Sequence, residues 1–251
     1  QIEDMLSYLG FSSLDEMSYE ILPKEIHSSS STRLPKASDE MDTINRLKEI
    51  SENNLIYRSF IGMGYYGTFM PGVIQRNIFE NPGWYTQYTP YQAEISQGRL
   101  EALLNYQTMV SDLTGLPISN ASLLDEATAA AEAMTMFYNN TRDIDKNVFL
   151  VSDSCHPQSI DVLKTRATPL GIELKVQNVN SFNFEDNVFG VLLQYPDTNG
   201  SINDHTDIIH TAHENDSYVC MATDLLALTL LKTPGEMGSD AAVGSAQRFG
   251  V

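Results

Sequence analysis

Four apolar runs in the second half of the chain constrain its fold more than any other feature. They lie at residues 148–151, 172–176, 188–193 and 218–222. Segments with helical spacing, at 159–165 and 206–213, lie between them. Largely apolar strands that alternate with helices are typical of a mostly parallel sheet covered on both faces. The pattern therefore predicts an α/β domain.

Two helices are expected before these strands. The first has an apolar face made by Leu100, Leu103, Leu104, Val110 and Leu113. Gly115 stands where a left-handed residue would end it. The second contains the small residues 127–133. Its open first turn would admit an anionic group or allow tight packing on a sheet, and we favour packing because no glycine-rich phosphate motif precedes it.

Residues 1–55 are predicted to form a helical N-terminal arm. Ser13 and Glu16 have the spacing of a capping box, and apolar residues recur at helical spacing between Met41 and Ile50. We expect residues 56–251 to form the α/β domain. Because the chain ends directly after a strand-like segment, we expect that domain to be incomplete at its C-terminal end.

Charge and cysteine content narrow the classes of partner. Fifteen Lys and Arg against 33 Asp and Glu give a formal net charge of −18, and this field repels nucleic acids and anionic lipids. No apolar run approaches the roughly 20 residues that cross a bilayer, so we expect a soluble chain.

Cys155 and Cys220 form no CxxC pair, which fits a bacterial cytoplasm or a mitochondrial matrix. His210 and His213 have no third ligand nearby, so we expect no metal site.

Two segments rich in glycine and tyrosine, residues 62–68 and 85–92, have the period of neither a helix nor a strand. Glycine lets the backbone approach a ligand closely, and tyrosine offers an apolar ring with a polar hydroxyl. These segments suit the binding of a small polar ligand. The alternative is that they are surface loops whose tyrosines cover a helix end.

Four longer runs carry a family resemblance. They read GMGYYGT, ENPGWYTQYTPYQAEISQGRLEALLNYQTMVSDLTG, NASLLDEATAAAEAM and KTPGEMGSDAAVGSAQRFG. Together they resemble the amino-terminal half of the glycine cleavage system P-protein, the decarboxylating glycine dehydrogenase, over essentially the whole chain. The resemblance implies the large domain of a fold type I pyridoxal-phosphate enzyme, a PLP-transferase-like architecture.

The resemblance also implies the chemistry. In that family glycine condenses with pyridoxal phosphate and loses CO2, and the aminomethyl group passes to the lipoyl group of the H-protein. Only the carboxy-terminal half or subunit carries the Schiff-base lysine, whose position corresponds here to Arg248. A guanidinium stays protonated and cannot form an imine. We therefore expect no catalytic residue in this chain, an inactive isolated chain, and a cofactor bound to the catalytic half.

By the same resemblance, residues 88–92 reach the active site that forms against the catalytic half. We expect a substrate wall of Tyr88, Tyr91 and Gln92, held from behind by Glu94, Ser96 and Gln97. An aromatic enclosure with a few polar donors would strip water from the glycine carboxylate and orient it.

Two strand-end residues invite comparison with the catalytic half. His156 and Asp224 stand where that half holds the histidine that stacks on the cofactor and the acid that pairs with its pyridine nitrogen. Without the lysine, we expect His156 to be a structural loop residue and Asp224 a relic or a helix cap.

The expected partners are the catalytic half or subunit, the lipoylated H-protein and glycine, in an oligomer. One alternative is a non-catalytic scaffold that only docks the catalytic half or the H-protein. An independent pyridoxal-phosphate enzyme would need a Schiff-base lysine after the last strands, and the sequence ends before showing one.

Overall fold

The computed structural model of the chain describes residues 1–28, 33–85, 92–141, 143, 145–185 and 187–250. It divides into two compact units, Gln1–Tyr57 and Arg58–Val251.

The first unit is helical. It contains α1 (Ile2–Leu9), α2 (Leu14–Ile21), a 3-10 turn (Lys24–Ile26) and α3 (Glu40–Ser51). Leu6 is the one buried apolar residue among those described in this unit, whereas Tyr8 and Ile56 are 91% and 99% exposed. The unit therefore has no hydrophobic core of its own.

The capping box predicted at α2 is only half formed. The Ser13 hydroxyl accepts a hydrogen bond from the Glu16 backbone N at 3.0 Å, as the spacing predicts. The Glu16 carboxylate, however, accepts from the Ser12 backbone N at 2.7 Å, one residue before the expected donor. Asp39 caps α3 by accepting from the Asp42 backbone N at 2.8 Å. Local polar contacts thus set where these helices begin.

The second unit is built around a five-stranded parallel sheet with the order β2-β1-β3-β4-β5. The strands are β1 (Val148–Ser152), β2 (Glu173–Gln177), β3 (Val188–Tyr195), β4 (Tyr218–Thr223) and β5 (Ala241–Val243). All four predicted apolar runs are strands, with ends shifted by one or two residues. The prediction of an α/β domain is confirmed.

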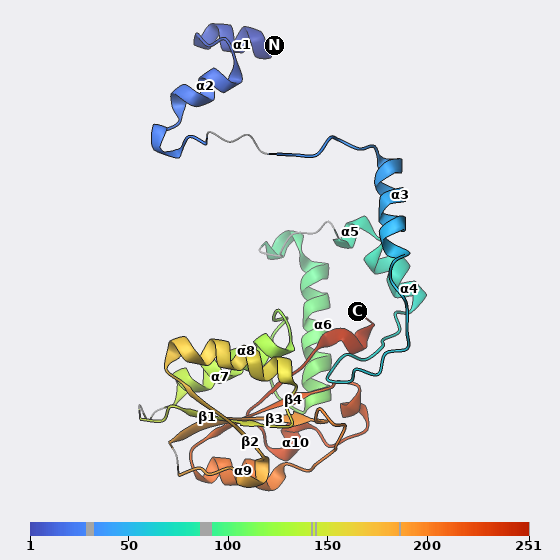
Figure 1. The fold of residues 1–251 in the computed structure, drawn as a ribbon. Coiled ribbons are helices and arrows are strands. Elements are labelled where there is room, and N and C mark those ends of the chain that lie inside the picture. The colour runs from blue at the N-terminus through green and yellow to red at the C-terminus, as the bar shows by residue number, and fades with distance from the viewer. Residues whose placement is uncertain (29–32, 86–91, 142, 144, 186, 251) are drawn as a thin grey trace. The chain divides into compact units, whose positions relative to one another are not determined.

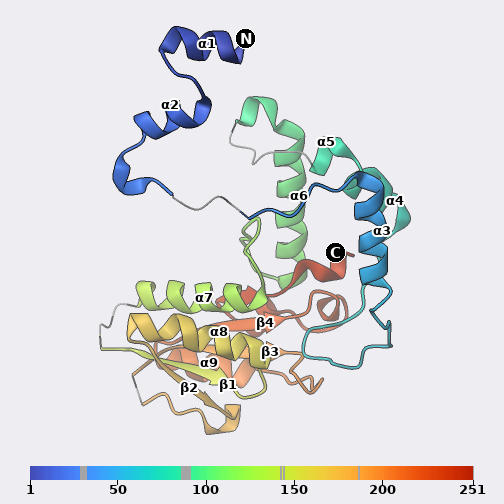
Figure 2. The same ribbon diagram turned by 45° about the horizontal axis from the view of Figure 1, so that its top comes forward.

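Helices cover both faces of the sheet (Figures 1 and 2). On one face lie α7 (Glu126–Asn140) and α8 (Pro157–Ala167), and on the other α9 (Thr206–Glu214) and the short α10 (Pro234–Met237). Each face has its own cluster of buried side chains. Parallel strands need this double cover, because neither face of the sheet can meet water.

The alanine-rich helix α7 packs directly on the sheet. Ala130 and Ala131 are fully buried, and Phe137 contributes to the same cluster. The approach is tight, since a Cβ placed on Gly190 would stand 2.9 Å from the Phe149 ring and 3.2 Å from the Phe137 ring. The preferred interpretation, in which small residues allow close packing, is confirmed.

The segments that precede α7 are less compact. They are α4 (Gly72–Ile74), a π-helical segment (Gln75–Phe79), α5 (Pro82–Tyr85), a 3-10 turn (Ala93–Ile95) and α6 (Gln97–Thr114). Gly115 ends α6 with φ +70°, the predicted left-handed position. None of the helices described is long and apolar enough to cross a membrane.

Short 3-10 turns complete the second unit. They lie at Thr168–Leu170, Val179–Ser181, Ala227–Thr229 and Ala246–Phe249. The last of these follows β5 and carries Arg248.

Candidate functional site

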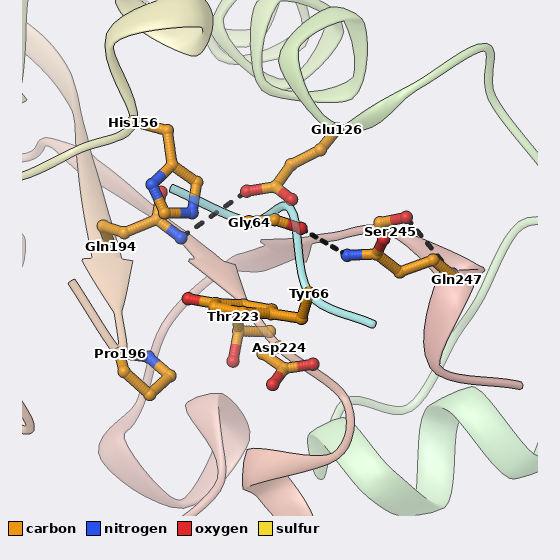
Figure 3. A pocket seen from close by; sticks show the side chains of 10 residues that line it. All are labelled: Gly64, Tyr66, Glu126, His156, Gln194, Pro196, Thr223, Asp224, Ser245 and Gln247. Carbon is orange, nitrogen blue, oxygen red and sulfur yellow. Dashed lines mark hydrogen bonds between the residues drawn. The ribbon is translucent and has the colours of Figure 1, made fainter. Parts of the chain in front are cut away.

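The carboxyl ends of β1, β3, β4 and β5 meet at one edge of the sheet, where open α/β sheets place their ligand sites. A small cavity of about 30 Å³ lies there. Figure 3 shows the ten residues that line it: Gly64, Tyr66, Glu126, His156, Gln194, Pro196, Thr223, Asp224, Ser245 and Gln247. The loop 62–68 thus lies against the strand ends, although it precedes them by a long stretch of chain.

An ion pair at this edge joins Arg248 to Asp224. The Arg248 Nε lies 2.9 Å from Asp224 Oδ1, and its terminal nitrogen lies 3.1 Å from Oδ2. The two side chains are only 15% and 23% exposed. Asp224 Oδ1 also accepts from the Leu226 backbone N at 3.3 Å, within the turn after β4. The helix cap expected for Asp224 is not formed, because the following 3-10 turn has Leu226 at its N-cap and no side-chain cap hydrogen bond. A two-pronged pair of this kind fixes both groups in orientation.

The loop 62–68 contacts the strand ends through several side chains. Gln247 Nε2 donates to the Gly64 carbonyl at 2.5 Å, and Gln158 Nε2 donates to the Met63 carbonyl at 2.8 Å. The Arg248 guanidinium lies 4.4 Å from the centre of the Tyr66 ring, within the range of a cation–π contact. The loop is therefore held from the sheet side.

His156 and Glu126 are titratable groups with shifted pKa values. Burial lowers the pKa of His156, with Asp197 opposing that effect, and its Nδ1 lies 2.5 Å from the Thr198 hydroxyl. Burial also raises the pKa of Glu126, whose carboxylate receives a long 3.5 Å hydrogen bond from Gln194 Nε2. His156 is 4% exposed, and its partner Thr198 lies in the segment after β3, so this contact joins the segments that follow β1 and β3.

Two buried polar atoms face the cavity without a hydrogen-bond partner among the described residues, Gln194 Oε1 and Thr223 Oγ1. A polar cavity of about 30 Å³ has room for water. Sites for drug-sized ligands span roughly 300–1,000 Å³. The cavity is therefore suited to water and not to an aromatic cofactor.

The lining residues do not fit covalently bound pyridoxal phosphate. None of the described lining residues is a lysine, and Lys232 contacts Asp204 and Thr206 instead. Asp224 is already bound by a guanidinium. At the start of α7, Asp125 accepts from the Thr128 backbone N at 2.7 Å and Glu126 faces the cavity. Two carboxylates thus occupy the helix end that would attract a phosphate.

Of the predicted substrate wall and the residues that hold it, the structure describes Gln92, Glu94, Ser96 and Gln97. Tyr88 and Tyr91 lie outside the described residues. Gln92, Glu94 and Gln97 are exposed, and Gln97 Nε2 donates to the Glu94 carbonyl at 2.8 Å. None of the three described residues Gln92, Glu94 and Gln97 lines the cavity at the strand ends.

Ser96, predicted to hold the wall from behind, is the one buried residue among the described members of this set, at 4% exposure, and its hydroxyl accepts from Arg99 at 3.0 Å. It lines a more open hollow of about 370 Å³ with Asn81, Gly83, Trp84, Ile95, Gly98 and Arg99. The structure brings Ser96 and Gln97 together at the start of α6, and the glycine-binding role of the whole set stays a prediction.

Sequence reasoning did not identify Glu126, Gln194 or the bonding of Asp224. A carboxylate next to the Asp125 cap was the only visible signal for Glu126. Among the described residues, no group of three or more His, Cys, Asp or Glu could hold a metal ion. His210 and His213 instead contact separate carboxylates, those of Glu214 and Asp240.

The five-stranded parallel sheet, covered by helices on both faces, has the architecture of the fold type I pyridoxal-phosphate enzymes. The structure of a cystine C-S lyase shares this fold, with a TM-score of 0.52 at 12% identity, over 76% of this chain and 53% of that one. The likeness shows the fold alone.

Residues 1–251 match the family model of the glycine cleavage system P-protein, and the chain belongs to that family. It is 55% identical to a glycine dehydrogenase (decarboxylating) of Nostoc sp. over 250 residues, which is 100% of this chain and 25% of that protein. It is also 55% identical to the mitochondrial enzyme of Dictyostelium discoideum, over 98% of this chain and 25% of the relative.

A crystal structure of glycine decarboxylase (P-protein) in inhibitor-bound form has a TM-score of 0.86 and 33% identity to this chain. The match covers 98% of this chain and 56% of that one. The chain spans about a quarter of the length of the curated relatives.

Proposed function

We propose that this chain is the amino-terminal part of a glycine decarboxylase. The complete enzyme would decarboxylate glycine on pyridoxal phosphate and transfer the aminomethyl group to the lipoyl group of the H-protein. In this proposal the chain supplies a wall of the substrate site and an interface, and the rest of the enzyme supplies the Schiff-base lysine. One observation carries the proposal. In this member of the P-protein family, Arg248, at the position that the resemblance assigns to the lysine, forms an ion pair with Asp224.

Imine formation requires an unprotonated amine, and a guanidinium cannot provide one. Arg248, at the position that the resemblance assigns to the lysine, is bound to Asp224 and lies over the Tyr66 ring. The cavity beside it has room only for water. These observations support a chain that is silent by itself and a cofactor held by the catalytic half.

The proposed contribution of this chain is enclosure. Tyr88, Tyr91 and Gln92 would exclude water from the glycine carboxylate, and loss of CO2 is easier from a carboxylate that is stripped of water. Ser96, Gln97 and Glu94 would hold this wall from behind. The hydrogen bonds of Ser96 with Arg99 and of Gln97 with Glu94 support an ordered base for it.

A partner surface is supported by apolar side chains in contact with water. Phe60, Phe69 and Leu124 are 85%, 96% and 85% exposed. Large apolar groups in such number mark surfaces that another chain or domain covers. We propose that the remainder of the enzyme covers them within an oligomer, in a bacterial cytoplasm or a mitochondrial matrix.

Reconstitution tests the proposal. Purified chain is mixed with the catalytic half, and glycine-dependent CO2 exchange is measured for the wild type and for Tyr88→Phe and Tyr91→Phe. The expected result is activity in the wild-type mixture only when both parts are present, reduced by each substitution. Tyr138→Phe is the matched control, because Tyr138 packs on Phe189 next to the sheet.

The exposed apolar surface equally suits a scaffold that only docks the catalytic half or the H-protein. Full activity of both tyrosine variants in the reconstituted enzyme would favour that alternative. An independent enzyme would instead show imine absorbance when the chain alone is incubated with pyridoxal phosphate.

A further inference from the structure

The loop 62–68 adopts a backbone that needs support from outside. Gly62, Met63 and Gly64 have successive φ values of +67°, +52° and +85°, and Met63 is a residue type that rarely takes this conformation. The backbone N of Tyr65 donates to the Gly62 carbonyl at 2.9 Å. Tyr65 and Tyr66 remain 59% and 38% exposed. Burial of the loop's own side chains therefore does little to order it.

The turn Ala246–Phe249 provides two of the contacts that order the loop. Gln247 donates to the Gly64 carbonyl, and the neighbouring Arg248 lies over the Tyr66 ring. Gln247 and Gly64 are 183 residues apart in sequence. One short turn thus holds both the backbone and the aromatic side chain of the loop.

Asp224 orients the guanidinium for this task. Its two oxygens bind Nε and one terminal nitrogen, at 2.9 and 3.1 Å. With these positions occupied, the Cζ of the guanidinium lies over the Tyr66 ring, 4.4 Å from its centre. A lysine ammonium is a point charge on a flexible stem, and it lacks the planar fork through which Asp224 fixes the guanidinium.

We infer that Arg248 is a positioning residue, held by Asp224, that fixes Tyr66 and the loop 62–68 against the strand ends in the assembled decarboxylase. The inference rests on the proposed function and adds to it that this loop borders the same cleft as the substrate wall. Arg248 would touch neither glycine nor cofactor. Its effect on the reaction would pass through the position of the loop.

The test uses the complete enzyme with Arg248→Lys and Arg248→Ala. Hydrogen exchange of the amides of residues 62–68 is expected to accelerate roughly two- to fivefold in Arg248→Ala, the loss of one partly exposed cation–π contact, and less in Arg248→Lys. Amides in β3 should be unchanged. The KM for glycine should rise more than kcat falls, whereas a smaller folded fraction would lower kcat and leave KM unchanged.

Added guanidinium chloride at low millimolar concentration should restore loop protection and KM in Arg248→Ala, and sodium chloride at the same ionic strength should not. Arg166→Ala is the matched control, because Arg166, in α8, also pairs with a carboxylate, that of Glu132 in α7. If Arg248→Ala does not fold, Tyr66→Leu removes the same contact from the loop side.

Wild-type exchange rates at residues 62–68 in a folded Arg248→Ala or Tyr66→Leu enzyme would overturn the inference. An equal effect of guanidinium chloride on Arg248→Ala and on Arg166→Ala would also overturn it. A wild-type enzyme that does not decarboxylate glycine would instead overturn the proposed function. The exchange and rescue data would still decide the role of Arg248 in ordering the loop.

Discussion

Both carboxylate oxygens of Asp224 are bound by the guanidinium of Arg248, at 2.9 and 3.1 Å, with the pair less than a quarter exposed. The acid at the end of β4 and the cation after β5 thus neutralise each other at the edge where open α/β sheets place their ligand sites. Two adjacent strand ends are joined by this pair, so it should contribute to stability as well as to loop position.

Removal of one partner of this pair is expected to destabilise the chain. Asp224→Asn or Arg248→Met should each lower the free energy of unfolding by about 2 kcal/mol, because a partly buried charge loses its partner. The double variant should be less destabilised than the sum of the two. Urea denaturation of the four proteins measures this coupling, and additive effects would contradict it.

Glu126 should make stability depend on pH. Its ordinary pKa of 4.5 is raised in the folded chain, chiefly by burial. The folded state therefore favours the protonated form of Glu126. The contribution of this group to the free energy of unfolding is fully present below pH 4.5 and is lost as pH rises through the folded pKa. Glu126→Gln should therefore be more stable than the wild type at neutral pH, and the difference should shrink towards acidic pH.

Unfolding free energies of wild type and Glu126→Gln across the acidic range measure this effect. The exposed Glu101, on α6, provides the control substitution Glu101→Gln. A constant difference between Glu126→Gln and wild type at every pH would contradict a raised pKa.

Gly235 should not tolerate a side chain. A Cβ at this position would lie 2.1 Å from the Gly115 carbonyl oxygen, and backbone cannot move aside as a flexible side chain does. Gly235→Ala is expected to cost about 3 kcal/mol. Gly98→Ala is the control, since nothing lies within 4 Å of its added Cβ and it stands in α6. Equal thermal midpoints of the two variants would contradict the close approach of α10 to the end of α6.

The Asp125 cap should stabilise α7. Its carboxylate accepts from the Thr128 backbone N at 2.7 Å, and loss of such a cap typically costs about 1 kcal/mol. Asp125→Ala should lower the free energy of unfolding by that amount, and Asp125→Ser should recover most of it. Identical denaturation curves for the alanine and serine variants would show that the cap contributes nothing.

Much of the fold could be predicted because its signals are local. The apolar runs that became β1 to β4, the small residues of α7 and the left-handed Gly115 each reflect the period or the conformational preference of neighbouring residues. The capping box at Ser13 shows the limit of such signals, since Glu16 found a donor one residue away from the expected one.

The site was predictable only in part. The chemical role of position 248 follows from side-chain type, because a guanidinium cannot serve as an imine-forming amine in any fold. The contacts of Arg248 do not follow from its side-chain type. Tyr66, Asp224 and Arg248 belong to separate segments, and no local pattern indicates that they meet at one edge of the sheet.

By itself, the amino-acid sequence determined the α/β class, the family and the absence of an amine at position 248, since these depend on local period, extended similarity and side-chain chemistry. Only the tertiary structure decided what Arg248 binds and how small the neighbouring cavity is. Those properties arise when parallel strands bring their carboxyl ends together and distant loops pack against them.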